Sequence, residues 1–430
     1  MNGTGSEEEG VKMEDTNETV VLMLGYLPGA SQDRSKLLSR ETVQFPATNI
    51  AGDSWKDVCG GGCGFAMAIS ENRKPITWES ADDQGQSYLT SGKHDETPEP
   101  FPLPTEAPMM KTAVGWAHCV STGEVYTWGW EECIPSGKIV CDFSSGGSFE
   151  KEPFGKQSSI LSEQAISETL SAPPCLVDLN PGVRITSVAA GGRHTLALSG
   201  KSTFSWILTL EKDSFQNHGW GYGGNGQIGL GSRIKMVSSP LLIPCIEPSS
   251  FEKDTSSVVH QGITNLTIKA PGTYIKGIAC GGRHMWARNT NDVLGPPCVS
   301  SLLGTQIEGI AAGLWHIICI SVEGRLHDFG GNQFSKLGTG TDQSENLPKL
   351  LDDPSLENKR AKIISCGARY SAILTEDGRV HCWGWNKYGQ LGLGDSIDRN
   401  VPSQVPIEGC LPKSLACGWW HTLLLAQIPF

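Results

Sequence analysis

A short pattern of small, polar and apolar positions recurs seven times along this chain of 430 residues. Each copy has a glycine, two variable positions, then a histidine or another aromatic residue, and an apolar run follows. The seven glycines are Gly62, Gly115, Gly191, Gly281, Gly313, Gly367 and Gly418. Short apolar runs of this kind predict strands that are buried on both faces.

A second pattern follows most of the copies, namely an alternating strand that ends in Trp-Gly or a related pair. It is clearest at Trp128, Trp220 and Trp383, in VYTWGW, HGWGYG and VHCWGW. Glycine-dependent loops such as GGNGQIGLG and NKYGQLGLG come next, and proline-bearing strands lie beyond them. Each unit therefore predicts about four short strands, which is one blade of a β-propeller.

The last copy predicts how the ring closes. Gly418 lies close to Phe430, so its Trp-Gly strand is missing at that end, and VVLMLGYLPG supplies Leu24-Gly25 near the other end. Pairing the two would remove the last open sheet edge. We therefore predict an all-β fold, a seven-bladed β-propeller over residues 20–430, closed by an N-terminal strand that pairs with the C-terminal blade. Residues 1–19 are expected to form an acidic, disordered N-terminus.

The copies are unequal, which predicts inserts and one reduced blade. The interval from Gly281 to Gly313 is the shortest between consecutive copies, so that blade should lack a loop or a strand. Long inserts rich in Ser, Gly and Pro are expected at about 131–174 and 232–274. Within the first, ILSEQAISETL has the spacing of a short surface helix. The segment at about 199–218 interrupts the pattern, as either a genuine insertion or a gene-model error.

Charge and composition restrict the partners. The 34 Lys and Arg against 46 Asp and Glu give a formal charge of −12, which repels phosphate backbones and attracts basic proteins. We expect no strong direct DNA binding. The N-terminus has no secretory pattern and no window resembles a membrane span, so we expect a soluble intracellular protein without membrane contact. Its thiols should stay reduced, with Cys280, Cys366 and Cys417 as small core residues.

Candidate chemistry is sparse. Five histidines share one repeat position, one in each of five blades, and are expected to hold turns by hydrogen bonds, too far apart to share a metal. They are His118, His194, His284, His316 and His421. Gly224, Gly226 and Gly229 spell a dinucleotide fingerprint, but the residues after them do not predict the helix that it needs. No catalytic motif is present, so we expect no enzyme, no metal and no cofactor.

These units, above all GGRHTLAL with WGWGYGGNGQIGLG and CGARYSAIL with DGRVHCWGWNKYGQLGLG, resemble the repeat of the regulator of chromosome condensation family. With its opening VLMLGYLPGA, the chain most resembles plant members related to the UV-B photoreceptor. That resemblance implies a nuclear, chromatin-associated protein that affects stress-responsive gene expression. It also leaves open the founding activity of the family, guanine-nucleotide exchange on a Ran-like small GTPase.

The variable positions of the repeat predict the binding residues. The resemblance implies that a UV-B receptor needs Trp then Arg on three consecutive blades. Here Trp116 and Trp419 are separated by the blade with Cys63, which disfavours light sensing.

We instead predict a non-enzymatic interaction scaffold, nuclear and also cytoplasmic, for protein partners such as histones or a small GTPase. Its candidate contacts are Trp116, Trp315, Trp419, Trp420, Arg193, Arg283 and Arg369. For Trp315 and Trp420, packing between blades is an equal alternative.

Overall fold

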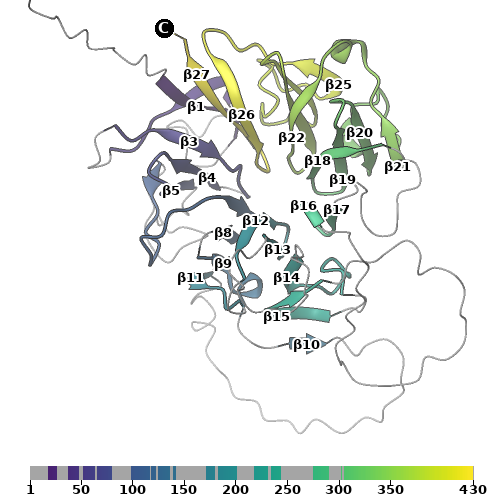
Figure 1. Cartoon of the computed structure of the whole chain (residues 1–430). Helices are drawn as coiled ribbons and strands as arrows, with labels where there is room; N and C mark the ends of the chain where they lie inside the picture. Colours follow the sequence, from purple (N-terminus) through teal and green to yellow (C-terminus); the bar gives the residue numbers. More distant parts are fainter. Residues whose placement is uncertain are drawn as a thin grey trace, which may run out of the picture.

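The computed structural model describes residues 18–26, 37–47, 52–62, 65–79, 98–116, 118–122, 124–135, 139–141, 171–179, 183–200, 217–230, 234–243, 275–289, 302 and 305–429. These residues form antiparallel sheets arranged in a ring (Figure 1). The predicted helix within residues 160–170, most of the segment at 199–218 and residues 1–17 lie outside the described residues.

Three blades of the ring come from residues 55–242. One contains β3 (Trp55–Val58), β4 (Phe65–Ser70), β5 (Pro75–Glu79) and β6 (Glu99–Pro100). The next contains β7 (Thr112–Val114), β8 (His118–Ser121), β9 (Tyr126–Trp130) and β11 (Ser171–Leu176), with the short 3-10 helix η1 (Glu131–Cys133). The third contains β12 (Ile185–Ala190), β13 (His194–Ser199), β14 (Asn217–Tyr222), β15 (Ile234–Leu242) and β10 (Ile139–Cys141). Thus part of the expected insert at 232–274 is an outer strand.

Three further complete blades and one smaller sheet close the ring. The smaller sheet has β16 (Ile275–Cys280) and β17 (Met285–Asn289). The following blades contain β18 (Ile307–Ala312), β19 (His316–Ser321), β20 (Leu326–Gly330) and β21 (Glu345–Leu350), then β22 (Ala361–Cys366), β23 (Tyr370–Thr375), β24 (Val380–Gly384) and β25 (Arg399–Gln404). The 3-10 turn η5 (Gln333–Ser335) lies between β20 and β21, and η6 (Pro354–Leu356) connects the two blades. The closing blade contains β26 (Leu411–Cys417), β27 (His421–Ile428), β1 (Glu18–Gly25) and β2 (Leu37–Val43).

The prediction of a propeller is confirmed, but that of seven complete blades is wrong for the described residues. They form six complete blades and, in the remaining position, the two-stranded sheet β16–β17. The reason is chain length. The connection from Asn289 at the end of β17 to Ile307 at the start of β18 is less than half as long as that from Ser321 to Ala361, which holds two further strands. The reduced unit was visible in the sequence as the short interval after Gly281.

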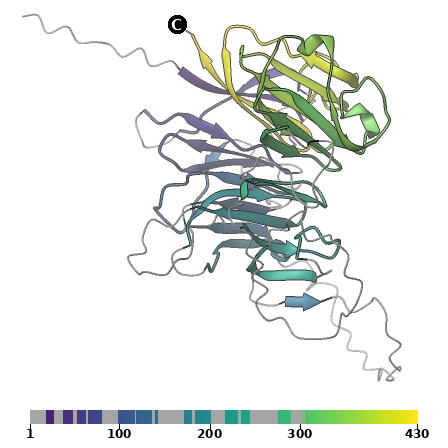
Figure 2. The same ribbon diagram turned by 45° about the vertical axis from the view of Figure 1, so that its right-hand side comes forward.

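The ring is closed by both ends of the chain. Strand β1 pairs antiparallel with β27, from Glu18 opposite Ile428 to Gly25 opposite His421. Figure 2 shows the same arrangement, with β1 beside the strands of the C-terminal end. The predicted pairing of the N-terminal strand is therefore present, and the inner two strands of this blade come from one end while the outer two come from the other.

Glycines at the repeat position let neighbouring blades meet backbone to backbone. A Cβ on Gly191 would lie 2.5 Å from the carbonyl oxygen of Gly281, and one on Gly281 would lie 2.5 Å from that of Gly313. Backbone hydrogen bonds cross at the same points, for example from Gly192 N to Gly281 O at 3.2 Å. Any side chain would force the blades apart, because real Cβ atoms do not approach backbone so closely.

The aromatic residue three positions later joins the same neighbours. In three blades a hydrogen bond links it to the next blade, through the hydroxyl group that follows an aromatic residue of the repeat. The bonds are His118 Nε2 to Thr195 Oγ1 at 2.9 Å, His316 Nε2 to Ser371 Oγ at 3.0 Å, and Thr422 Oγ1 to the Tyr370 hydroxyl at 3.0 Å. The rings of His118 and His316 thus join neighbouring blades, and do not hold the turn of their own blade as expected.

Burial keeps the repeat histidines neutral. Desolvation lowers the pKa of His118, His284 and His421 to about 4 each. The pKa of His194 falls to about 3, mainly by burial, and that of His316 lies well below the ordinary value for the same reason. Each side chain gains a proton on unfolding below pH 6.5, because the unfolded chain has ordinary pKa values.

We therefore expect stability to fall as the pH drops from about 6.5 towards 4. The folded state excludes protons that the unfolded state binds, at a cost of roughly 1 kcal/mol per histidine between pH 7 and 5.5. Urea unfolding of the wild type at these two pH values measures the effect. A midpoint that is equal at pH 7 and pH 5.5 would contradict it.

Asp328 is a buried acid at a position where the other blades have an uncharged residue. It is 0% exposed, and neither carboxylate oxygen has a hydrogen-bond partner within the described part of the chain. Burial raises its pKa well above the ordinary value. The corresponding residue of β9 is Thr127, whose hydroxyl donates to the carbonyl of Cys119 at 3.0 Å.

Replacing the buried acid, Asp328→Thr, should stabilise the protein by about 1–3 kcal/mol at pH 7, because an unpartnered polar group leaves the interior. The size of this gain in stability depends on pH. An acid whose pKa is raised in the folded state destabilises the protein at neutral pH, and this destabilisation disappears as the pH falls towards 4. Urea midpoints at pH 7 and 5 should show a gain that shrinks on acidification. Asp352→Thr, at an exposed acid, is the control and should change little.

Candidate interaction surface

The strand register places all the predicted contact residues on one face of the ring. The turn after each glycine connects the innermost strand to the second strand, at the same end of every blade. The third strand ends there too, since Gly129 pairs with His118, Gly330 with His316 and Gly384 with Tyr370. The loops that follow the Trp-Gly strands therefore adjoin the repeat turns.

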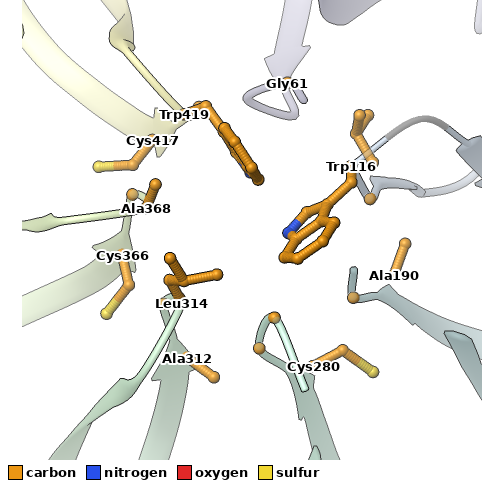
Figure 3. A pocket seen from close by; sticks show the side chains of 18 residues that line it. Gly61, Trp116, Ala190, Cys280, Ala312, Leu314, Cys366, Ala368, Cys417 and Trp419 are labelled. Carbon is orange, nitrogen blue, oxygen red and sulfur yellow. The ribbon is translucent and has the colours of Figure 1, made fainter. Parts of the chain in front are cut away.

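A narrow central channel opens on this face. Seven chain segments line it, one from each sheet, with small residues such as Ala190, Cys280 and Ala312 (Figure 3). The indoles of Trp116 and Trp419 lie over the opening, with ring centroids 5.1 Å apart in an edge-to-face contact. The cavity of about 70 Å³ has room for a few water molecules only, whereas small-molecule sites enclose about 300 Å³ or more.

Aromatic side chains from four blades continue from the channel across this face. We call them the aromatic cluster; its members are Tyr26, Trp116, Phe334, Trp385, Tyr388, Trp419 and Trp420. Centroids of contacting rings are between 4.9 Å and 5.6 Å apart, and most contacts are edge-to-face or tilted, which is the favourable geometry for aromatic pairs. Phe334 is exposed, and the other rings are half-buried. The cluster thus forms a continuous, partly exposed aromatic patch.

Arg369 lies within this patch. Its guanidinium carbon is 4.8 Å from the ring centroid of Phe334, 5.0 Å from that of Trp385 and 5.9 Å from that of Trp420. A cation in contact with three rings is held by their quadrupoles and loses part of its freedom. The arginine therefore presents a fixed positive charge on the aromatic surface.

The other predicted arginines have different surroundings. Arg283 lies over the exposed ring of Trp315 at 5.6 Å, so these two predicted residues form a separate pair. Arg193 lies 5.0 Å from the Trp130 ring and forms an ion pair of 3.2 Å with Glu132. The structure thus joins Trp116, Trp419, Trp420 and Arg369, and keeps Arg193, Arg283 and Trp315 apart from them. Their role in binding stays a prediction.

Four members of the cluster were not predicted from the sequence. Trp385 and Tyr388 occur in WGWNKYGQ and Phe334 in the matching GGNQFSKL, directly after the third strand. The repeat alignment contained the signal, because that loop must adjoin the G-x-x-H turn of its own blade. Tyr26 follows the closing strand β1 and stacks on Tyr388 at 5.3 Å.

Other chemistry is limited within the described part of the chain. No three of its His, Cys, Asp and Glu side chains are close enough together to hold a metal ion. Burial raises the pKa of Cys59 and Cys133 to about 12, so these thiols are protonated. The glycine loop at 224–229 leads into the strand β15, so its dinucleotide-like spacing belongs to a turn. No described helix has the length and apolarity to cross a membrane.

Together these features define a β-propeller that presents a partly exposed aromatic and cationic surface on one face. Two models of the Regulator of chromosome condensation (RCC1) repeat match the chain, one at residues 323–374 and 377–425 and the other at 361–390. Residues 323–425 of the chain therefore contain RCC1 repeats, and the predicted resemblance to this repeat is confirmed.

Known proteins resemble it over larger parts. The Ultraviolet-B receptor UVR8 of Arabidopsis thaliana is 30% identical over 265 residues, which are 61% of this chain and 54% of the receptor. The chain thus spans about half the length of that relative. The structure of human WBSCR16 has a TM-score of 0.67 at 18% sequence identity, and the match covers 96% of this chain and 100% of WBSCR16. Prp20p of Saccharomyces cerevisiae, described with its binding properties to Gsp1p and histones, has a TM-score of 0.67 at 16% sequence identity. That match covers 97% of this chain and 93% of Prp20p. Both structures support the fold alone.

Proposed function

We propose that this chain is a non-enzymatic interaction scaffold whose docking surface is the aromatic cluster with Arg369. The observation that carries the proposal is the cluster itself, a run of seven connected rings on one face with a fixed cation among them. Tryptophan, tyrosine and arginine are the residues most enriched at binding hot spots. A rigid ring holds them in place, so little order has to be gained on binding.

The proposed role is that of a nuclear, chromatin-associated regulator that binds basic partners such as histones and acts in stress-responsive gene expression, in the nucleus and also the cytoplasm. The net charge of −12 supports a basic partner, because a long-range field of this sign raises its encounter rate. The fold shared with Prp20p, which was studied with histones, supports the choice of histones as first candidates.

A pull-down with core histones at physiological salt tests the site. Trp420→Ala and Trp385→Ala should each weaken capture about tenfold or more, because a truncated hot-spot residue costs about 2 kcal/mol. Arg360→Ala, at an exposed ion pair with Glu376 on the opposite face, serves as the control and should retain capture. Full capture by both tryptophan variants would remove the assignment of this surface.

Guanine-nucleotide exchange on a Ran-like small GTPase is the second candidate. The observation that favours it is the same fold likeness, since Prp20p was also studied with Gsp1p. Stopped-flow release of labelled GDP from the GTPase, with and without this protein, separates the two functions. A scaffold should leave the release rate unchanged, and an exchange factor should raise it by orders of magnitude.

A further inference from the structure

One turn of the aromatic surface departs from its counterparts in the other blades. After the third strand, the chain makes a tight turn in which a glutamine side chain accepts a backbone N–H from two residues earlier. Gln227 Oε1 accepts from Asn225 N at 2.8 Å, and Gln390 Oε1 accepts from Tyr388 N at 3.0 Å. In the blade of β18–β21 the same position is Lys336. An ammonium group cannot accept, so this turn loses its side-chain cap.

The turn of Lys336 also takes a different backbone path. Phe334 has a φ of 66°, in the left-handed region that residues other than glycine rarely adopt, whereas the positive φ of 56° at Ser335 is shared by Gly226 and Gly389 of the matching turns. The ring of Phe334 is 38% exposed and lies beside Trp385, with centroids 5.6 Å apart. The lysine at this position therefore coincides with an exposed aromatic side chain at the edge of the cluster, held there by a backbone conformation that costs free energy.

Lys336 brings a second cation to this place without a counter-ion. Its side chain is 2% exposed, and its ammonium donates to Gln333 O at 3.2 Å, which leaves two N–H groups. No ion pair joins Lys336 or Arg369 to a carboxylate of the described residues. Burial and the nearby Arg369 lower the pKa of Lys336 to about 8. Arg369 lies over the ring of Phe334, two residues before Lys336, so the two positive charges belong to neighbouring parts of this surface, and neither pairs with a carboxylate of the described residues.

We propose that Arg369 and Lys336 receive a carboxylate from an acidic segment of a partner protein, framed by Phe334, Trp385 and Trp420. The proposal rests on the scaffold function and specifies the chemistry that docks at this end of the surface. A carboxylate would satisfy the free N–H groups of both cations, in charge-assisted hydrogen bonds that are stronger than neutral ones. Apolar neighbours of the acidic residue would cover the exposed rings.

The net charge decides between an acidic peptide and a nucleic acid. A phosphate backbone carries one charge per nucleotide along its whole length, and a chain with a net charge of −12 repels it outside the two cations. An acidic residue between aromatic or aliphatic ones brings a single charge to the place where the cations are. The negative charge of the whole surface attracts basic proteins at long range. The two cations bind one carboxylate only at contact distance, so both interactions can occur with the same partner protein.

Binding of a rhodamine-labelled Glu-Ser-Phe peptide that carries a single glutamate, followed by fluorescence anisotropy, tests the proposal. Lys336→Gln and Arg369→Gln should each weaken binding at pH 7 by roughly fivefold or more, because each removes a charge-assisted bond. Lys336→Gln restores the residue of the two matching turns, so the fold should be kept. Arg360→Gln is the control: it removes an exposed arginine on the opposite face, where Glu376 pairs with it, and should not alter binding.

The pH profile adds a readout that a merely structural lysine would not give. Wild-type affinity should fall between pH 7 and pH 9 as Lys336 loses its proton, and the profile of Lys336→Gln should be flat. The charged or titratable groups near this lysine are Arg369 and His316, and the pKa of His316 lies well below this range because of burial. The glutamate of the peptide remains ionised throughout.

Three results would overturn the proposal: equal binding of a Gln-Ser-Phe peptide, unchanged affinity and pH profile in Lys336→Gln, or preference for a labelled oligothymidine over the acidic peptide. The scaffold function is judged separately. If Trp420→Ala abolishes partner capture while Lys336→Gln leaves peptide binding unchanged, only the carboxylate site is wrong. If neither variant affects capture or peptide binding, the surface itself is not a docking surface and both proposals fail.

Discussion

The close approach of neighbouring blades at the repeat glycines is the constraint on which the rest of the structure depends. A side chain at Gly191 would collide with the backbone carbonyl of Gly281. With glycine there, this carbonyl accepts a hydrogen bond from Gly192 N of the neighbouring blade. That contact brings the histidine of one blade within reach of the hydroxyl of the next. It also sets the width of the channel, so that two indoles suffice to cover it.

The interaction surface follows from this constraint. Because the repeat turns are pulled towards the axis, the two variable positions of each turn must point to one face or over the channel. The loops after the third strands then surround them, which is how Trp385 and Tyr388 come to contact Trp420. Rigid, buried strands thus support a set of side chains that the fold itself leaves free to vary, and protein recognition can use such positions.

Much of the fold could be predicted from the sequence because the repeat is local. Gly62 to Gly418 mark the blades, and Leu24-Gly25 identifies the closing strand. The number of complete blades could not be obtained by counting anchors, since an anchor such as Gly281 shows the inner strands and not whether outer strands follow. The candidate site was partly predicted, because Trp116, Trp419, Trp420 and Arg369 do come together. Arg193 instead forms an ion pair with Glu132, and the sequence did not predict the path of the loop that holds Glu132.

The shared closing blade has a consequence for the time course of folding. On the ribosome, Glu18–Gly25 are made before any other blade, but their partner His421–Ile428 emerges only after all the other blades have been made. Until then Val21–Leu24, which are apolar and buried in the finished ring, can pair only with β2 on one side, and the other edge of β1 has no partner. Contacts so distant along the chain form slowly and leave apolar segments exposed meanwhile. The ring is thus sealed only after its other blades have been synthesised.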